Sequence, residues 1–402
     1  MILKNIILHL SLIEYVPHRF LHELINKISA QKLTEVYNFS VQDFVALGCG
    51  FDKAQLLVLG LQNKQRLSDE LKIIEQNSAA FITFFCDEYP NLLKHIDVPP
   101  LVLYYQGDVS LFAKAKKFAC VGARKSHLYV HDALKLLIAP MIQDDWVIVS
   151  GGAAGADTYA HQITLDNKGK TIMVVGSGLC HRYPASNRDL FEQVVYDGGL
   201  IVSVFHMEMP PEPHCFPMRN RIISGLSIGC LVLQAAKKSG ALITANCALQ
   251  QGREVFALPG SIFDPLSVGC HDLIQLGAKL VTSTQDILEE LSYPGKPDFV
   301  QMTILGHEKK EKGLTKALPS SQSKKALGWQ SSLKSQASHS APVYDDLDDL
   351  SRAIMHCTVT PITSQALLSR VETTLDELQR KLFELSLDGK IAQDGMGMWK
   401  RV

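Results

Sequence analysis

The chain has 402 residues, enough for two or three domains, and its 40 basic and 41 acidic side chains leave a formal net charge of −1 at pH 7. This balance excludes a globally basic surface, so a nucleic-acid site would have to come from local clustering of cations. Hydrophobic residues make up 46% and charged residues 20%, as in soluble globular proteins, and no uninterrupted apolar run is long enough to span a bilayer.

The nine cysteines stand singly and form no C-x-x-C pair. Their pattern predicts neither a disulfide framework nor a metal site, and it fits a reducing cytoplasm. The apolar start of the chain is interrupted by His9 and Glu14, and no small-residue cleavage site follows it. We therefore expect an amphipathic helix there, no signal peptide, and a cytoplasmic protein without a membrane partner.

Residues 1–75 are expected to form a helical domain. Apolar side chains such as Phe20, Leu21 and Leu24 recur at helical spacing, and the glycines at 48 and 50 permit a tight helix–turn–helix. Most modules of this kind pack against other domains or bind partners, and some contact the DNA backbone.

Residues 76–293 are expected to form an α/β domain. Short runs rich in β-branched residues alternate with helical segments, which predicts parallel strands with helices on both faces, a Rossmann-like fold. The runs that belong to the alternating pattern are 118–121, 146–150, 171–175, 200–204, 230–233, 254–258 and 279–282.

Several of these strands end in glycine, as at Gly122, Gly151 and Gly176. Ligands of open parallel sheets bind beyond the carboxyl ends of the strands, where glycine allows close approach of the backbone. The loop 150–157 leads directly into a helix, and its amides are placed to cradle a phosphate. The loop matches neither the dinucleotide fingerprint nor the Walker motif, so it predicts no cofactor and no ATP hydrolysis.

No catalytic residues are expected. His161, in the helix after this loop, has no serine or cysteine nucleophile at a known spacing, and we interpret it as structural. No pair of carboxylates in the loops has the spacing of a glycosidase or of a metal site.

The segment 199–227 carries the strongest binding signal. It begins as a buried strand, passes through a proline-rich loop, and reaches Phe216-Pro217-Met218-Arg219-Asn220-Arg221 just before a predicted helix. Arginine forks pair with phosphate oxygens, and phenylalanine stacks on unstacked bases. With Arg124 and Arg182 from neighbouring loops, these residues would form one basic cleft. In the alternative interpretation, Phe216 fills the core and the arginines are ordinary surface charge.

The C-terminal part of the sequence predicts a linker followed by a small domain. Residues 294–343 contain eight lysines and a Ser/Gln/Lys tract, which is typical of a flexible linker. Residues 344–402 predict three helices and a hairpin, a winged helix. The third helix, 374–387, is rich in acidic residues, which favours binding of a partner over reading of the major groove.

The middle of the chain resembles the bacterial DNA-processing protein A family (DprA or Smf). The matching stretches are VGARKS (121–126), VSGGAAGADTYAHQITL (149–165), TIMVVGSGLCHRYPASNRDL (171–190), FPMRNRIISGLS (216–227), SGALITANCALQQGREVFALPG (239–260) and VGCHDLIQLGAKLV (268–281). The resemblance implies an extended Rossmann-like domain, flanked by an N-terminal domain like a sterile-alpha-motif or helix–hairpin–helix fold and by a C-terminal winged helix. It further implies a protein without catalytic activity that binds single-stranded DNA and loads the RecA recombinase on it in natural transformation.

The resemblance also assigns residues to the single-strand groove. Those expected there are Gly122, Arg124, Ser150, Gly151, Gly152, Ala153, Gly155, Gly176, Gly178, Arg182, Phe216, Pro217, Arg219, Asn220, Arg221, Ser239, Gly240 and Thr244. It implies a two-fold dimer, for which Leu273, Ile274 and Leu276 offer apolar surface. Two positions depart from the family: Val204 and Gln234 stand where it commonly carries glutamates, which makes the cleft more positive.

Two other functions stay open at this point. The same glycine loops bind nucleoside monophosphates in other proteins, so a nucleotide or phosphoribosyl hydrolase on this scaffold is the alternative. A transcription regulator is a third class, and it would require specific binding of duplex DNA by the winged helix.

Overall fold

The computed structural model describes residues 3–28, 33–292 and 348–358, together with shorter stretches between 362 and 401. The chain divides into two compact units, residues 1–308 and 309–402. The predicted linker, 294–343, lies outside the described residues. Among the described residues, no helix is both long and apolar enough to cross a membrane.

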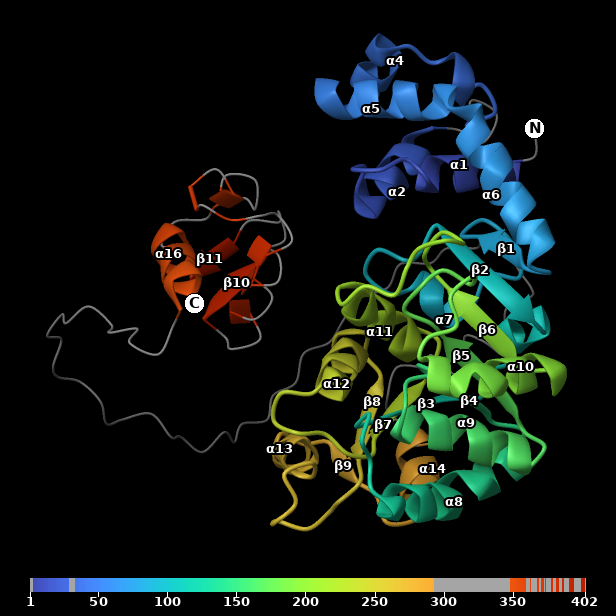
Figure 1. Ribbon diagram of the computed structural model, residues 1–402, viewed down its shortest axis with the longest axis vertical. Coiled ribbons are helices and arrows are strands. Elements are labelled where there is room, and N and C mark those ends of the chain that lie inside the picture. The colour runs from blue at the N-terminus through green and yellow to red at the C-terminus, as the bar shows by residue number, and fades with distance from the viewer. Residues whose placement is uncertain are drawn as a thin grey trace, which may run out of the picture. The chain divides into compact units, whose positions relative to one another are not determined.

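The first unit begins with a layer of helices, drawn in blue in Figure 1. Their apolar positions face inward: Ile6, Ile7 and Leu10 are fully buried, as is Leu21 on the next helix. Ser40 caps a later helix in a capping box with Asp43. These helices are α1 (Leu3–Ser11), α2 (His18–Lys27), α4 (Val41–Ala46), α5 (Phe51–Gln62) and α6 (Lys64–Gln76), with a 3₁₀ turn at Val36–Asn38.

A nine-stranded sheet follows, in the order β1-β2-β6-β5-β4-β3-β7-β8-β9. From β6 to β9 all neighbours are parallel, whereas β1 and β2 extend the sheet in antiparallel pairing. The predicted parallel-rich, Rossmann-like sheet is therefore confirmed, with an antiparallel extension at one edge. The strands are β1 (Ala80–Thr83), β2 (Val102–Gly107), β3 (Lys117–Val121), β4 (Val147–Ser150), β5 (Lys170–Val174), β6 (Leu200–Ser203), β7 (Gly229–Val232), β8 (Glu254–Ala257) and β9 (Lys279–Leu280).

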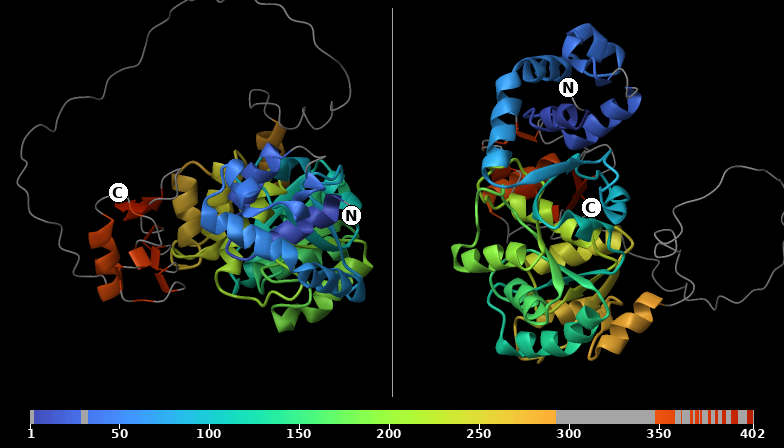
Figure 2. Two further views of the ribbon diagram at one scale, coloured as in Figure 1. Left: turned by 90° about the horizontal axis from the view of Figure 1, so that it is seen from above. Right: turned by 90° about the vertical axis from the view of Figure 1, so that its right-hand side faces the viewer.

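Helices cover both faces of this sheet (Figure 1 and Figure 2). Side chains alternate along β3: Phe118 and Cys120 pack with α8, α9 and α14, while Ala119 and Val121 pack with α11, α12 and α13. Because both faces are covered, the central strands are apolar along most of their length. The helices are α7 (Asn91–Lys94), α8 (Leu128–Gln143), α9 (Ala156–Asp166), α10 (Arg188–Tyr196), α11 (Cys215–Gly225), α12 (Gly240–Gln250), α13 (Val268–Gln275) and α14 (Thr284–Ser292), with 3₁₀ turns at Val109–Ala113 and Ala185–Asn187.

The order of the strands reverses at β3. The chain runs outward from β3 through β4 and β5 to β6, and then returns to place β7 on the other side of β3. In open α/β sheets the crevice at such a reversal, beyond the carboxyl ends of the strands, is the usual place for a ligand.

The second unit is described in part. Helix α16 (Asp349–Cys357) is capped by Asp348, and β10 (Ile391–Gln393) pairs antiparallel with β11 (Trp399–Arg401). Apolar side chains from these elements share a small core with Leu367, Leu378 and Leu382. The predicted winged helix stays a prediction, because much of its second and third helices lies outside the described residues.

Candidate functional site

A cavity of about 590 Å³ opens where the strand order reverses, and we call it the β3–α11 cavity. It is bounded by the turn after β3, the first turns of α11 and the start of α12. Ligand pockets commonly have volumes of this order. The predicted site residues that line it are Gly122, Arg124, Ala153, Phe216, Pro217, Arg219, Asn220, Ser239, Gly240 and Thr244.

Phe216 forms one wall of the β3–α11 cavity and is half-buried. The guanidinium of Arg124 lies over its ring, 5.1 Å from the ring centroid, and the ring of Tyr183 lies 5.6 Å away. Behind the ring is Gly176, where an added Cβ would come within 2.7 Å of Phe216. Gly176 was expected to line the single-strand groove, and in the structure it makes room for an aromatic ring. Tyr183, 44% exposed, was not among the predicted site residues.

Arg219 forms the floor of the cavity and is only 4% exposed. It donates hydrogen bonds to the carbonyl oxygens of Gly151, at 2.5 Å, and of Val174, and its Nε donates to Asn220. Burial lowers the pKa of Arg219 to about 10, an effect that the nearby carboxylate of Asp157 opposes. Arg219 therefore ties the ends of β4 and β5 to α11, which differs from the exposed phosphate contact that the motif predicts.

In the glycine loop 150–155, a side chain of the protein itself, Asp157, binds a backbone amide. The amide of Ala153 donates to Oδ2 of Asp157 at 3.2 Å, and the amide of Gly151 also favours the charged form of this carboxyl. Burial raises the pKa of Asp157, while Arg219 and these amides oppose the shift. The carboxyl thus occupies the position that the predicted phosphate cradle would give to a ligand.

Neighbouring residues hold this loop in place. Asn187 donates to the carbonyl oxygens of Gly152 and Ala153, at 3.1 and 3.3 Å. Ser150 donates to the carbonyl oxygen of Cys120 across the sheet, and Gly155 has a φ of 82° that favours glycine. The loop is therefore a rigid support for the cavity, and its glycines serve packing.

Beneath the loop, His161 is fully buried, and its Nδ1 lies 2.7 Å from the hydroxyl of Thr171. Burial lowers the pKa of His161 to about 3, so the ring is neutral at pH 7. This agrees with the structural role expected for it.

The structure does not bring Arg182, Arg221 and Gly178 into the β3–α11 cavity. Arg182 donates to the side chain of Gln106 at 2.7 Å and lies over the ring of Phe191. Arg221 lies on α11 between Asn220 and Ile223, which line the cavity, but it donates to the carbonyl oxygens of residues 97 and 98 instead. Gly178 packs against the backbone of residues 206 and 207. The expected cleft of four arginines is therefore not assembled, because the fold uses three of them for internal contacts.

The exposed cations of the cavity are Arg124, Lys125 and Lys238. The two lysines were not among the predicted residues, although Lys125 directly follows Arg124 and Lys238 directly precedes the cap of α12. Ser239 caps that helix by accepting from the amide of Ala241. Three cations on one rim satisfy the requirement for local clustering that the near-zero net charge imposes.

Helix α11 begins at Cys215, so Phe216 to Arg221 belong to it, whereas the sequence pattern placed them before it. Its Asn220 donates to the carbonyl oxygen of Gly240 at 3.2 Å and joins α11 to α12. The loop before α11 rests on the helical layer, because buried Glu70 accepts a hydrogen bond from the amide of Met207 at 2.8 Å. The wall formed by α11 is thus held by α12 on one side and, through the loop before α11, by the helical layer.

The predicted dimer residues differ in exposure. Leu273 is only 6% exposed and belongs to the protein's own core, and Ile274 packs against that core, whereas Leu276 is 86% exposed. Of the two departures from the family, Gln234 is buried and Val204 packs against the core on the α11 side of the sheet. Within the described residues, no group of three His, Cys, Asp or Glu side chains is placed to hold a metal ion.

Comparisons with known proteins bear on the region that contains this cavity. Residues 80–292 match the family described as DNA recombination-mediator protein A. The DNA processing protein DprA of Bacillus subtilis is 46% identical over 204 residues, which is 51% of this chain and 68% of that protein. Its counterpart from Streptococcus pneumoniae is 45% identical over 207 residues, 52% of this chain and 72% of that protein.

The fold is also similar to a solved structure. The X-ray structure of DNA processing protein A from Streptococcus pneumoniae matches with a TM-score of 0.58 and 35% sequence identity. The match covers 69% of this chain and 99% of that one. Every residue that lines the β3–α11 cavity falls within the 80–292 region.

Proposed function

The chain belongs to the DNA recombination-mediator protein A family, and we propose that it binds single-stranded DNA in the β3–α11 cavity. The observation that carries the proposal is the half-buried ring of Phe216, which contacts the ring of Tyr183 and lies under the exposed guanidinium of Arg124. An aromatic face beside a cation suits a base and its phosphate. The bases of a duplex are paired and stacked on each other, so only a single strand can offer such a base.

The residues of the cavity divide into two roles. Arg124, Lys125 and Lys238 attract the backbone from the rim, and Phe216 receives a base. Arg219 and Asp157 act as positioning residues, because both are buried and bonded within the protein. This division replaces the expected grip by Arg219 and Arg221 on the phosphates.

We further propose that the bound strand is passed to the RecA recombinase, that two copies of the chain act together, and that the protein is a cytoplasmic mediator without catalytic activity. The family description and the DNA-processing relatives support a role in recombination. The alternative of a nucleotide hydrolase loses its main support, because Asp157 already occupies the glycine loop. His161 is also too deeply buried to act as a general base on a ligand in the cavity.

The test is a fluorescence-anisotropy titration of labelled oligo-dT and of a duplex of equal length, each at several salt concentrations. We expect tight binding of oligo-dT, weak binding of the duplex, and an affinity that falls linearly with salt on logarithmic axes. Equal affinity for both DNAs would contradict the proposal. Incubation with nucleoside monophosphates in the same buffer tests the hydrolase, for which we expect no product.

A further inference from the structure

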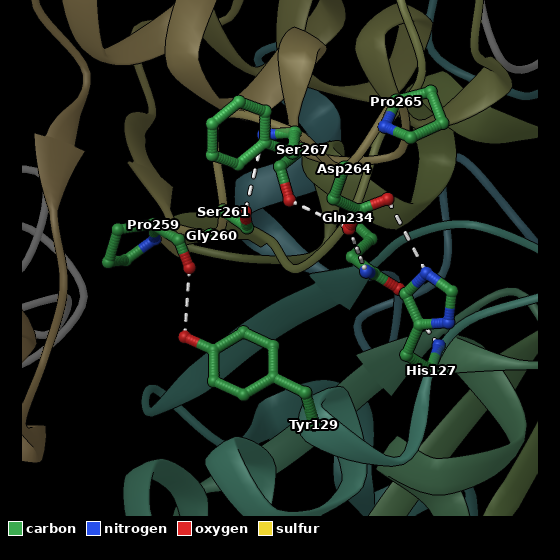
Figure 3. Close-up of a pocket in the computed structure, with 10 residues that line it drawn as sticks. His127, Tyr129, Gln234, Pro259, Gly260, Ser261, Asp264, Pro265 and Ser267 are labelled. Carbon is green, nitrogen blue, oxygen red and sulfur yellow. Dashed lines mark hydrogen bonds and ion pairs between the residues drawn. The ribbon is translucent and has the colours of Figure 1, made fainter.

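A second cavity, of about 790 Å³, lies beside the first at the carboxyl ends of the strands, and we call it the β8–α13 cavity. Its lining comes from the start of α8, from Gln234 two residues after β7, and from the loop 259–267 between β8 and α13. Figure 3 shows Tyr129 and His127 on one side and this loop on the other. None of these residues was among the predicted site residues.

The polar groups of this cavity satisfy one another. The Asp264 carboxylate accepts hydrogen bonds from Gln234 at 3.0 Å, from the hydroxyl of Ser267 at 3.0 Å and from the amide of Leu266 at 2.9 Å, with His127 at 3.4 Å (Figure 3). Tyr129 donates to the carbonyl oxygen of Pro259 at 2.8 Å. A ligand therefore finds little hydrogen-bonding capacity here, and the cavity is suited to a flat apolar surface rather than to the reading of polar groups.

Large apolar side chains in this lining are exposed: Phe263 is 89% exposed and Tyr129 48%. Their chain neighbours Ile262 and Leu128 are 79% and 74% exposed. The turn that presents Phe263 is ordered, because its amide donates to the hydroxyl of Ser261 and the amide of Asp264 donates to the Ser261 carbonyl. An exposed aromatic ring on an ordered turn offers contact area at a low cost in conformational entropy.

The two cavities form neighbouring parts of one surface, since the same three segments line both. After β3, Lys125 faces the β3–α11 cavity and His127 the β8–α13 cavity. After β7, Gln234 lines the β8–α13 cavity and Ala236 lines the β3–α11 cavity. In the loop before α13, Pro265 and Ser267 line the β8–α13 cavity, whereas Leu266 between them lines the β3–α11 cavity. Lys125 and His127 are two residues apart on one loop, so the exposed side chain of Lys125 lies on the way from the β3–α11 cavity to the β8–α13 cavity.

We propose that the β8–α13 cavity is a second base-stacking subsite, in which Phe263 and Tyr129 receive an unstacked base of the strand held at Phe216. This inference rests on the proposed function and extends it from one base to a path along the sheet edge. Because the polar floor is satisfied, the subsite accepts every base, which suits a protein that binds single strands without regard to sequence. The carboxylate of Asp264 disfavours a phosphate in this cavity, so the backbone runs along Lys125 and the base points inward.

The experiment measures the affinity of the full-length chain for oligo-dT from about 4 to about 16 nucleotides, a span that covers common single-strand site sizes. For Phe263→Ala we expect parent affinity on the shortest strand that binds and a loss of about tenfold on longer strands. Phe263→Tyr should retain the parent affinity at every length. Phe216→Ala should lose affinity at all lengths, and Tyr196→Ala, which alters an exposed ring on α10, should behave as the parent.

Two results would overturn the inference while leaving the proposed function intact. In the first, the parent and Phe216→Ala behave as expected, but Phe263→Ala binds every length as the parent does. In the second, Phe263→Ala changes the mass measured by light scattering without changing affinity per protomer, which would make the apolar surface a contact between protein chains. Failure of the parent to bind any oligo-dT would overturn the proposed function itself.

Discussion

The floor and the wall of the β3–α11 cavity both contain an arginine, yet they treat it in opposite ways. On the floor, Arg219 is buried, faces Asp157, and donates to two strand-end carbonyl oxygens. On the wall, Arg124 is exposed and its guanidinium lies over Phe216. The comparison teaches that a cation in a motif is available to a ligand only when the fold leaves its donors unused. Substitutions of the floor residue Arg219 should therefore lower the free energy of unfolding, and substitutions of the wall residue Arg124 should weaken DNA binding.

The largest expected effect comes from Arg219→Met. Removing this guanidinium leaves two strand-end carbonyl oxygens without their donor and takes the nearby positive charge from the buried Asp157 carboxyl. Each buried polar group left unsatisfied costs about 1–3 kcal/mol, so we expect a loss of roughly 2–6 kcal/mol. Urea unfolding should show that loss in the free energy of unfolding. The same substitution at exposed Arg124 is the control, and we expect a change within about 0.5 kcal/mol.

An equal and small effect of both substitutions on unfolding would break the distinction between floor and wall. In that case a loss of DNA affinity in Arg219→Met would restore the direct phosphate contact that the motif predicts.

Phe216→Ala tests the wall, with an expected loss of about 1–3 kcal/mol in binding of oligo-dT. Phe216→Leu is the matched control for packing, since leucine still fills the space over Gly176 but offers no ring to a base. We expect Leu and Ala to weaken binding to a similar extent, measured by anisotropy, with circular dichroism as the check on folding. Parent-like binding by Phe216→Leu would mean that the side chain only supports the wall.

Protonation of His161, which is buried beneath the glycine loop, should have a smaller effect on the free energy of unfolding. Its pKa is about 3 in the folded protein, against an ordinary value of about 6.5, so the unfolded chain binds the proton more tightly. The neutral ring of His161 therefore leaves the free energy of unfolding at its full value above pH 6.5. As the pH falls from 6.5 toward 3, the unfolded chain takes up the proton and the free energy of unfolding decreases. Between pH 7 and about pH 5.5 this uptake should lower the free energy of unfolding by about 1 kcal/mol.

Urea unfolding of the parent and of His161→Gln at both pH values measures this contribution. The variant should lose about 1 kcal/mol less than the parent over this interval, because glutamine does not titrate. An identical pH dependence in the two proteins would show that His161 is not the group responsible.

Much of the fold followed from the sequence because its signals are local. Runs such as 118–121 and 230–233 are apolar and β-branched, and they became β3 and β7 in a parallel sheet. The glycines at strand ends also pointed to the edge where the strand order reverses, and the β3–α11 cavity opens there. The helix start was expected after Arg221, whereas α11 begins at Cys215 and includes Pro217, a residue that is tolerated in the first turn of a helix.

The hydrogen-bond partners of the arginines could not be predicted from the sequence in the same way. Arg182, Arg219 and Arg221 find their partners at Gln106, Val174 and Val98, far away in the sequence. Only the packed sheet brings such pairs together, so the motif alone could not separate them from Arg124. Tyr183 was missed for the same reason, because its contact with Phe216 depends on how two loops meet.

The smallest effect, and the sharpest test of the wall, is the salt dependence of Arg124 variants. Each phosphate neutralised on a single strand contributes about 0.7 to the slope of log affinity against log salt. Arg124→Ala should make the slope shallower by about 0.7, whereas Arg219→Met, if it folds, should leave it unchanged because a buried guanidinium releases no counterion from DNA. Arg124→Lys is the matched control: it keeps the charge and the slope but loses the planar group over Phe216, so its affinity should fall between the parent and the alanine variant. Anisotropy titrations of oligo-dT at four or more salt concentrations measure all three slopes. An unchanged slope in Arg124→Ala, together with a shallower one in Arg219→Met, would reverse the roles that the structure gives to wall and floor.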